Sequence, residues 1–237
     1  AAAQGLMAGL NPALAAGGSE RITLSRADAY IGVLIDDLIT RGTAEPYRMF
    51  TSRAEYRLSL RADNADQRLT PLGMAIGCVG VSRETSWTAK AAALESARRL
   101  VRDLAMTPPE LVKRGIPVNQ DGQKRNAATL LGYPDMSVAK LAEIWPELRD
   151  LRADVVEQIE IDGRYAGYME RQEADILAFR KDESLILPAG LDFDVVGGLS
   201  NEVRAKLKSH QPGTLGQAAR ISGVTPAALS ALLGYVK

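Results

Sequence analysis

Six arginines and no lysine lie between positions 41 and 68 of this chain, and their side chains suit the binding of anions. A guanidinium donates two parallel hydrogen bonds to one phosphate or carboxylate and also stacks on rings, so arginine in place of lysine favours planar bidentate contacts. Three aromatic residues, Tyr47, Phe50 and Tyr56, are interleaved, as is typical of a nucleic-acid surface. The six are Arg41, Arg48, Arg53, Arg57, Arg61 and Arg68.

The same arginines have an alternative role inside the protein. Four acidic side chains lie within residues 41–70, and three of them, Glu55, Asp63 and Asp66, are close enough in sequence to pair with the arginines. Structural salt bridges would then account for the series without any ligand. The spacing alone leaves both interpretations open.

A second candidate site is the stretch Ala-Arg-Ile-Ser-Gly-Val-Thr-Pro at positions 219–226. A glycine turn followed by a capped helix can present backbone N–H groups to a phosphate. Two-helix hairpins that turn on glycine are also common in helical bundles, where the same turn forms a packing or partner surface. A partner surface is the interpretation that we favour, and its candidate residues are Arg220, Ser222, Gly223 and Thr225.

The composition excludes several classes of site. With one cysteine, Cys78, the chain forms no internal disulfide framework and no multi-cysteine zinc or iron–sulfur centre, and a reducing, cytosolic compartment is expected. One histidine, His210, excludes a histidine-rich metal centre, and no metal site is expected. The 29 basic and 29 acidic side chains balance, which offers no global argument for a polyanionic partner. Known nucleotide-binding and hydrolase motifs are absent, as is an apolar run long enough to span a membrane.

Helical periodicity dominates the chain and predicts a mainly α fold. Period-two alternation over Tyr56 to Arg61 predicts a short strand or extended segment near 54–61. A small helical domain is expected at the C-terminal end. The predicted helices cover residues 1–10 (ending at Asn11-Pro12), 25–42, from 70 onward, 82–107, short pieces between 107 and 148, then 150–182, 200–209, 214–222 and 225–236.

Two glycines, Gly163 and Gly167, lie one turn apart inside the long helical pattern. A mid-helix glycine costs about 1 kcal/mol relative to alanine, so this pair indicates that something approaches that face closely. A neighbouring helix is the simpler explanation, and the edge of a substrate or cofactor is the alternative.

Four segments together closely resemble the C-terminal part of the bacterial MnmG (GidA) family. The resemblance runs in order along essentially the whole chain, is dense in residues 1–80 and 159–235, and is loose in 83–150. The segments are AAAQGLMAGLN, AYIGVLIDDLITRGTAEPYRMFTSRAEYRLSLRADNADQRLTPLG, RYAGYMERQ and GLSNEVRAKL…PGTLGQAARISGVTPAAL.

The resemblance implies an FAD-dependent, cytoplasmic flavoprotein that acts with the GTPase MnmE. Its activity would be to form 5-carboxymethylaminomethyluridine at the wobble position of certain tRNAs, with methylenetetrahydrofolate as one-carbon donor and NADH as reductant of the flavin. The resemblance also implies a homodimer at full length. The family's dinucleotide fingerprint and catalytic cysteines match nothing here, so the chain resembles a C-terminal fragment that alone neither binds FAD nor turns over.

The resemblance also implies roles for individual residues and segments. Arg48 and Arg57 would contact tRNA phosphates or the substrate base, and Tyr47 and Tyr56 would stack. Residues 1–80 would form the end of the flavin domain with the arginine-rich segment, 81–158 a helical linker, and 159–237 a docking domain for MnmE and tRNA. The full tRNA-binding set is Tyr47, Arg48, Arg53, Tyr56, Arg57, Arg61 and Arg68, oriented by Glu55 and Asp66. The alternative is a purely protein-interaction helical module in which the arginines are structural.

Overall fold

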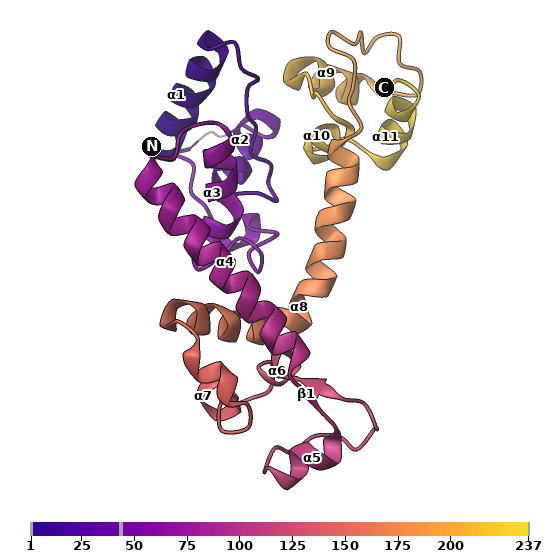
Figure 1. The fold of residues 1–237 in the computed structure, drawn as a ribbon. Coiled ribbons are helices and arrows are strands. Elements are labelled where there is room, and N and C mark those ends of the chain that lie inside the picture. Colours follow the sequence, from indigo (N-terminus) through magenta and orange to yellow (C-terminus); the bar gives the residue numbers. More distant parts are fainter. Residues whose placement is uncertain (1, 43–44, 237) are drawn as a thin grey trace. The chain divides into compact units, whose positions relative to one another are not determined.

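The computed structural model describes residues 2–42 and 45–236, and this part of the chain is mainly helical, as predicted (Figure 1). Its one sheet is a pair of antiparallel two-residue strands, Ala105–Met106 (β1) and Arg125–Asn126 (β2). The helices are α1 (Ala2–Ala16), α2 (Tyr30–Thr40), η1 (Thr51–Arg53), α3 (Ala65–Ala75), α4 (Val81–Asp103), α5 (Pro108–Lys113), α6 (Ala127–Leu130), α7 (Val138–Leu141), η2 (Pro146–Asp150), α8 (Ala153–Glu183), α9 (Asn201–His210), α10 (Leu215–Arg220) and α11 (Pro226–Leu233).

The chain divides into two compact units. The terminal unit combines Ala1–Leu60 with Arg171–Lys237, and the middle unit is Arg61–Glu170. Helix α8 therefore contributes its first part to the middle unit and its last part to the terminal unit. The arginine series is divided in the same way, because Arg57 belongs to the terminal unit and Arg61 to the middle unit.

The middle unit is built around α4, α6, α7 and the start of α8. Leu111, Leu130 and Leu141 are fully buried in its core. The short helices between 107 and 148 are confirmed, and polar side chains start them: Asn126 caps α6 and Ser137 caps α7. Each cap satisfies an N–H group that the helix itself leaves unpaired, which allows such short helices to form.

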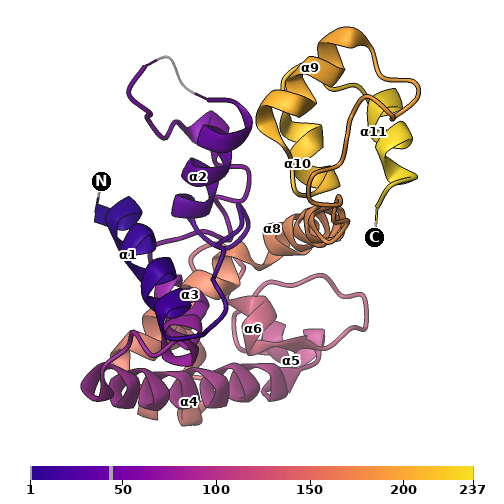
Figure 2. The same ribbon diagram turned by 90° about the horizontal axis from the view of Figure 1, so that it is seen from above.

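The last part of the terminal unit is a small helical bundle, in which α9, α10 and α11 gather at the C-terminal end of α8 (Figures 1 and 2). Leu207, Ala218 and Leu232 are fully buried in its core. The three helices begin where the sequence predicts, and Ser200, Thr214 and Thr225 each accept a hydrogen bond from the backbone N–H three residues on. The predicted C-terminal helical domain is thus confirmed as a fold.

The predicted strand or extended segment near 54–61 is wrong, because the chain forms successive turns there. The backbone N–H of Arg57 donates to the Ala54 carbonyl (3.3 Å), and that of Leu60 donates to the Tyr56 carbonyl (2.8 Å). Buried Ala54 and Leu60 anchor the two ends of the segment. Local hydrogen bonds thus replace the pairing with a neighbouring strand that period-two alternation presupposes.

Three helix boundaries also differ from the prediction. Helix α1 continues through Pro12 to Ala16, while the Asn11 amide bonds the backbone of Ile22 instead of ending the helix. Helix α3 begins at Ala65, so Pro71 lies inside it rather than in its first turn. Helix α2 begins only at Tyr30, because residues 25–28 form a turn in which the Ser25 backbone N–H and hydroxyl both donate to the Asp28 carboxylate.

None of the helices in residues 2–42 and 45–236 is long and apolar enough to cross a membrane.

Candidate functional site

Two arginines of the series, Arg48 and Arg57, are exposed on the segment between α2 and α3. Within the described residues neither guanidinium has an ion-pair partner. The Arg48 guanidinium carbon lies 5.3 Å from the centre of the Phe50 ring, and Phe50 is itself half exposed. These two side chains are therefore free to bind an anion from solvent.

Arg53 lies between the exposed and the buried parts of this segment. Its guanidinium carbon is 4.8 Å from the centre of the Tyr47 ring and 6.0 Å from that of Phe50, distances typical of cation–π contacts. Its Nη1 atom is 3.9 Å from Oδ2 of Asp37, and 38% of the side chain remains exposed. Arg53 is thus held on one side and open to solvent on the other.

Beneath this segment lies an arginine that sequence reasoning missed. Arg26 is 2% exposed, and its guanidinium donates to Asp36 (3.0 Å), Asp37 (2.7 Å) and Glu55 (2.6 Å). Burial alone would lower its pKa, but the bonds to Asp37 and Glu55 outweigh burial and raise it. The adjacent acids in the otherwise apolar helix α2 were the available signal, because buried carboxylates require a partner.

Arg220 belongs to the same charge network. It forms two bonds to Asp36, from Nε (2.7 Å) and Nη2 (2.8 Å), and a third from Nη1 to Glu183 (2.7 Å). Its guanidinium carbon also lies 5.3 Å from the centre of the Phe179 ring. Internal carboxylates thus engage this guanidinium, which argues against partner docking through Arg220. Of its predicted companions, Ser222 and Gly223 are exposed at the turn, and Thr225 caps α11.

The residues expected to orient the arginines have other partners. Glu55 accepts from Arg26, and Asp66 accepts from Lys90 Nζ (2.6 Å). The expectation that they orient Arg48 and Arg57 is therefore not supported by the geometry. Tyr56 is half buried with its ring 5.7 Å from that of Phe179, and burial followed by the charge of Glu55 raises its pKa. Its ring packs inside the unit.

Arg61 and Arg68 both bond groups within the protein, as the alternative of structural arginines predicts. Arg61 bonds Asp63 (2.9 Å), lies 3.6 Å from Asp162, and stacks 4.5 Å from the centre of the Tyr165 ring. Arg68 donates to the Asn64 side chain (2.9 Å) and to the Arg61 carbonyl (3.1 Å). Both arginines thus hold the start of the middle unit together.

Asp63 shows the electrostatic effect of this arrangement. Burial would raise its pKa, but hydrogen bonds from Arg61 and Gln158 outweigh burial and lower it.

In the part of the chain that the structure describes, no group of three or more His, Cys, Asp or Glu side chains is placed to hold a metal ion.

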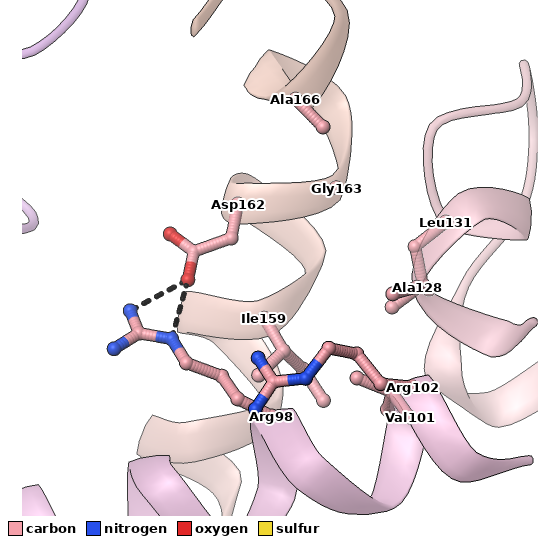
Figure 3. A pocket seen from close by; sticks show the side chains of 9 residues that line it. All are labelled: Arg98, Val101, Arg102, Ala128, Leu131, Ile159, Asp162, Gly163 and Ala166. Carbon is pink, nitrogen blue, oxygen red and sulfur yellow. Dashed lines mark hydrogen bonds and ion pairs between the residues drawn. The ribbon is translucent and has the colours of Figure 1, made fainter. Parts of the chain in front are cut away.

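The middle unit also contains a pocket of about 220 Å³ between α4, the end of α6 and α8 (Figure 3). Its walls are mainly apolar, including Val101, Leu131 and Ile159. At its edge Arg98 donates two bonds to Oδ2 of Asp162, from Nε (3.0 Å) and Nη2 (2.6 Å). A third charged side chain, Arg102, also lines the pocket, and its Nη2 atom lies 3.8 Å from Glu95. The rest of the lining offers an apolar surface.

The two glycines of α8 differ in their surroundings. A Cβ placed on Gly163 would lie 2.5 Å from the Cβ of Leu131, so a neighbouring element does approach this face closely. A Cβ on Gly167 would meet nothing within 4 Å. The helix-packing explanation is therefore confirmed for Gly163 alone.

Comparisons with known proteins identify relatives over the whole chain. Residues 82–173 match the family model described as the C-terminal helical domain of the tRNA modifying enzyme MnmG/GidA, and residues 175–237 match the model of its C-terminal helical bundle. The tRNA uridine 5-carboxymethylaminomethyl modification enzyme MnmG of Granulibacter bethesdensis is 47% identical over 237 residues, and that of Geobacillus thermodenitrificans is 44% identical over 240. Both alignments include the whole chain, which spans 38% of each relative's length.

Solved structures give the same result. GidA of Aquifex aeolicus in its form II crystal superposes with a TM-score of 0.83 at 37% identity, covering 98% of this chain and 37% of that one. The form I crystal gives a TM-score of 0.79 at 36% identity, covering 96% of this chain and 35% of that one. The likeness thus extends over both compact units.

Proposed function

Because the chain belongs to the MnmG (GidA) family of tRNA-modifying enzymes, we propose that it is the recognition part of an enzyme that forms 5-carboxymethylaminomethyluridine at the wobble position of tRNA. The observation that carries this proposal is the pair of exposed guanidiniums, Arg48 and Arg57, which lack a carboxylate partner within the described residues. By contrast, the guanidiniums of Arg26 and Arg220 in the same unit are engaged by internal carboxylates.

The chemistry of the segment fits the tRNA backbone. An exposed guanidinium displaces the counterions of a phosphate, and it binds that phosphate through two parallel hydrogen bonds. Half-exposed Phe50, 5.3 Å from the Arg48 guanidinium, adds a surface on which an unpaired base can stack. In this proposal Arg48 and Arg57 bind phosphates, Arg53 contributes from its exposed side, and Arg61 and Arg68 are structural.

The cofactors are proposed for the whole protein only: FAD, NADH as its reductant, and methylenetetrahydrofolate as one-carbon donor. The described residues do not fit a dinucleotide site, which requires a glycine-rich loop between a parallel strand and a helix. The sheet in residues 2–42 and 45–236 is one antiparallel pair of two-residue strands. We propose that the chain alone is inactive. A cytoplasmic location and a homodimer at full length stay predictions.

The helical bundle of α9, α10 and α11 is proposed as the docking site for the GTPase MnmE. The bundle has its own core, yet Val195 and Leu233 are at least half exposed on it. A contiguous apolar patch on a surface is typical of a partner contact, and the Tyr235 hydroxyl, two residues after Leu233, bonds the Val195 carbonyl (3.2 Å) and so places the two exposed side chains in the same part of the bundle. Ser222 and Gly223, exposed at the turn between α10 and α11, belong to the same proposed surface.

The test of the tRNA role is the salt dependence of tRNA binding by the full-length protein. Arg48→Ala and Arg57→Ala are each expected to weaken binding and to reduce the slope of log K against log salt by about 0.7–0.9, since each removes one phosphate contact. Arg83→Ala is the matched control, because Arg83 is also exposed but lies on α4. Unchanged affinity and slope in both variants would overturn the phosphate role.

The test of the docking role is co-purification with MnmE. Leu233→Glu is expected to abolish it, because a charge in the apolar contact lacks a partner when desolvated. Val112→Glu is the control, since Val112 is 49% exposed on α5 and belongs to the middle unit. If Leu233→Glu protein still retains MnmE, the docking surface is elsewhere.

A further inference from the structure

One carboxylate, Asp37, joins the buried charge network to the exposed arginine segment. Its Oδ1 atom accepts from Nη1 of buried Arg26 (2.7 Å), and its Oδ2 atom accepts from the Tyr47 hydroxyl (2.8 Å). The same Oδ2 atom lies 3.9 Å from Nη1 of Arg53. With a side chain only 4% exposed, Asp37 faces Arg26 from below and Tyr47 with Arg53 from above.

Tyr47 is fixed at both its ends. Its hydroxyl donates to Asp37, and its ring lies 4.8 Å from the Arg53 guanidinium carbon. Burial, followed by the bond to Asp37, raises the pKa of Tyr47, so the hydroxyl stays protonated and remains a donor at neutral pH. A ring fixed in this way limits the positions open to the guanidinium above it.

We propose that Asp37 and Tyr47, supported by Arg26, are positioning residues that hold Arg53 in the orientation in which it contacts tRNA. This inference rests on the proposed function. It assigns to the buried network a role beyond stability, because Asp37 lies 3.9 Å from Nη1 of Arg53 and Tyr47 stacks against the same guanidinium. Nη1 of Arg41 is also 3.9 Å from Asp37, but within the described residues only Arg53 combines this contact with the Tyr47 ring. Arg26 also bonds Asp36 and Glu55, and these bonds anchor the network within the terminal unit.

The arrangement continues to helix α10. Asp36 Oδ2 accepts from both Arg26 (3.0 Å) and Arg220 (2.7 Å), so α2 is bonded to α10 directly behind Asp37. Glu183 of α8 accepts a hydrogen bond from the third nitrogen of this guanidinium, Nη1 of Arg220 (2.7 Å). One support of Arg53, Asp37, therefore lies on a helix that is itself bonded to α10, while the other, Tyr47, lies on the same segment as Arg53.

The decisive variant is Tyr47→Phe in the full-length protein. It removes the hydroxyl that bonds Asp37 but keeps the ring beneath Arg53. We expect tRNA affinity to fall about three- to tenfold with the melting temperature nearly unchanged, and Arg53→Ala to lower affinity as well. In the Arg53→Ala background, Tyr47→Phe should cause no further loss, because nothing is left to position. A residue that only stabilised the fold would lower affinity equally in both backgrounds.

Tyr235→Phe is the matched control, since the Tyr235 hydroxyl bonds the Val195 carbonyl within the bundle and lies outside the network. If Arg53→Ala weakens binding while Tyr47→Phe does not, or if the two effects add, the positioning role is overturned and the proposed function stands. An Arg53→Ala variant with normal affinity also overturns the positioning role. The proposed function is then judged on Arg48→Ala and Arg57→Ala, which are independent of this network.

Discussion

Gly163 of α8 lies so close to Leu131 that a Cβ at position 163 would be 2.5 Å from the Leu131 Cβ and 3.0 Å from its carbonyl carbon. Two backbones meet here without a side chain between them. Because the obstacle includes backbone, a small rotation of Leu131 cannot make room. Four residues further along, the same helix passes Gly167, where a Cβ would meet nothing within 4 Å.

Substituting these two glycines by alanine should therefore have opposite effects on stability. Gly167→Ala gains helix propensity and is expected to raise the free energy of unfolding by up to about 1 kcal/mol. Gly163→Ala gains the same propensity but overpacks the contact with Leu131, and a net loss of about 1–3 kcal/mol is expected. Urea unfolding followed by circular dichroism measures both. Equal effects of the two substitutions would show that α8 and Leu131 are not in close contact.

A second prediction concerns Arg220, whose side chain is 15% exposed and bonds Asp36 and Glu183. Arg220→Met keeps the packing against Phe179 but leaves two carboxylates without this partner. We expect a loss of about 2–4 kcal/mol, since breaking a buried ion pair leaves uncompensated charge. Lys208→Met breaks the exposed pair with Asp194 and should cost less than about 1 kcal/mol. Chemical denaturation measures the unfolding free energy of both variants. Similar losses in Arg220→Met and Lys208→Met would show that the Arg220 ion pairs are as exposed to solvent as the Lys208 pair.

The third prediction is an acid sensitivity that depends on Asp37. Burial would raise its pKa, but bonds from Tyr47 and Arg26 outweigh burial and lower it. A carboxyl whose pKa is lower in the folded than in the unfolded state stabilises the fold above its unfolded pKa, and this contribution disappears as pH falls through the folded value. The difference in unfolding free energy between wild type and Asp37→Asn should shrink below about pH 4. A difference that is independent of pH would contradict the lowered pKa.

The sequence allowed most of the helices to be predicted, because their signals are local. Ser200, Thr214 and Thr225 cap the helices they were expected to cap, since a hydroxyl three residues before a free N–H needs no distant partner. The prediction of a strand or extended segment near 54–61 is wrong for the opposite reason. Alternation predicts a strand only if a partner strand exists, and Ser59 instead bonds Gln172 of α8 (2.8 Å), 113 residues away.

The candidate site was predictable only in part, because an arginine's role depends on which carboxylates the fold brings to it. Arg57 and Arg61 are four residues apart and of one type, yet they fall in different compact units. Arg26 was missed because the acids that surround it are separated from it by up to 29 residues. The charge of Arg220 looked available for a partner because Asp36, 184 residues away, left no trace in the local pattern.

The arginine series includes both a structural member, Arg61, which pairs with Asp63, and an exposed member, Arg57. Arg61→Ala removes the bonds to Asp63 and Asp162 and the stacking on Tyr165, so the unfolding free energy should fall by about 1–2 kcal/mol. Its effect on tRNA binding should be small, and the salt slope should match that of the wild type, since no phosphate contact is lost. Arg57→Ala should do the reverse, with normal stability and a slope reduced by about 0.7–0.9. If Arg61→Ala reduces the slope as Arg57→Ala does, then Arg61 also binds phosphate and the ion pair with Asp63 opens when tRNA binds.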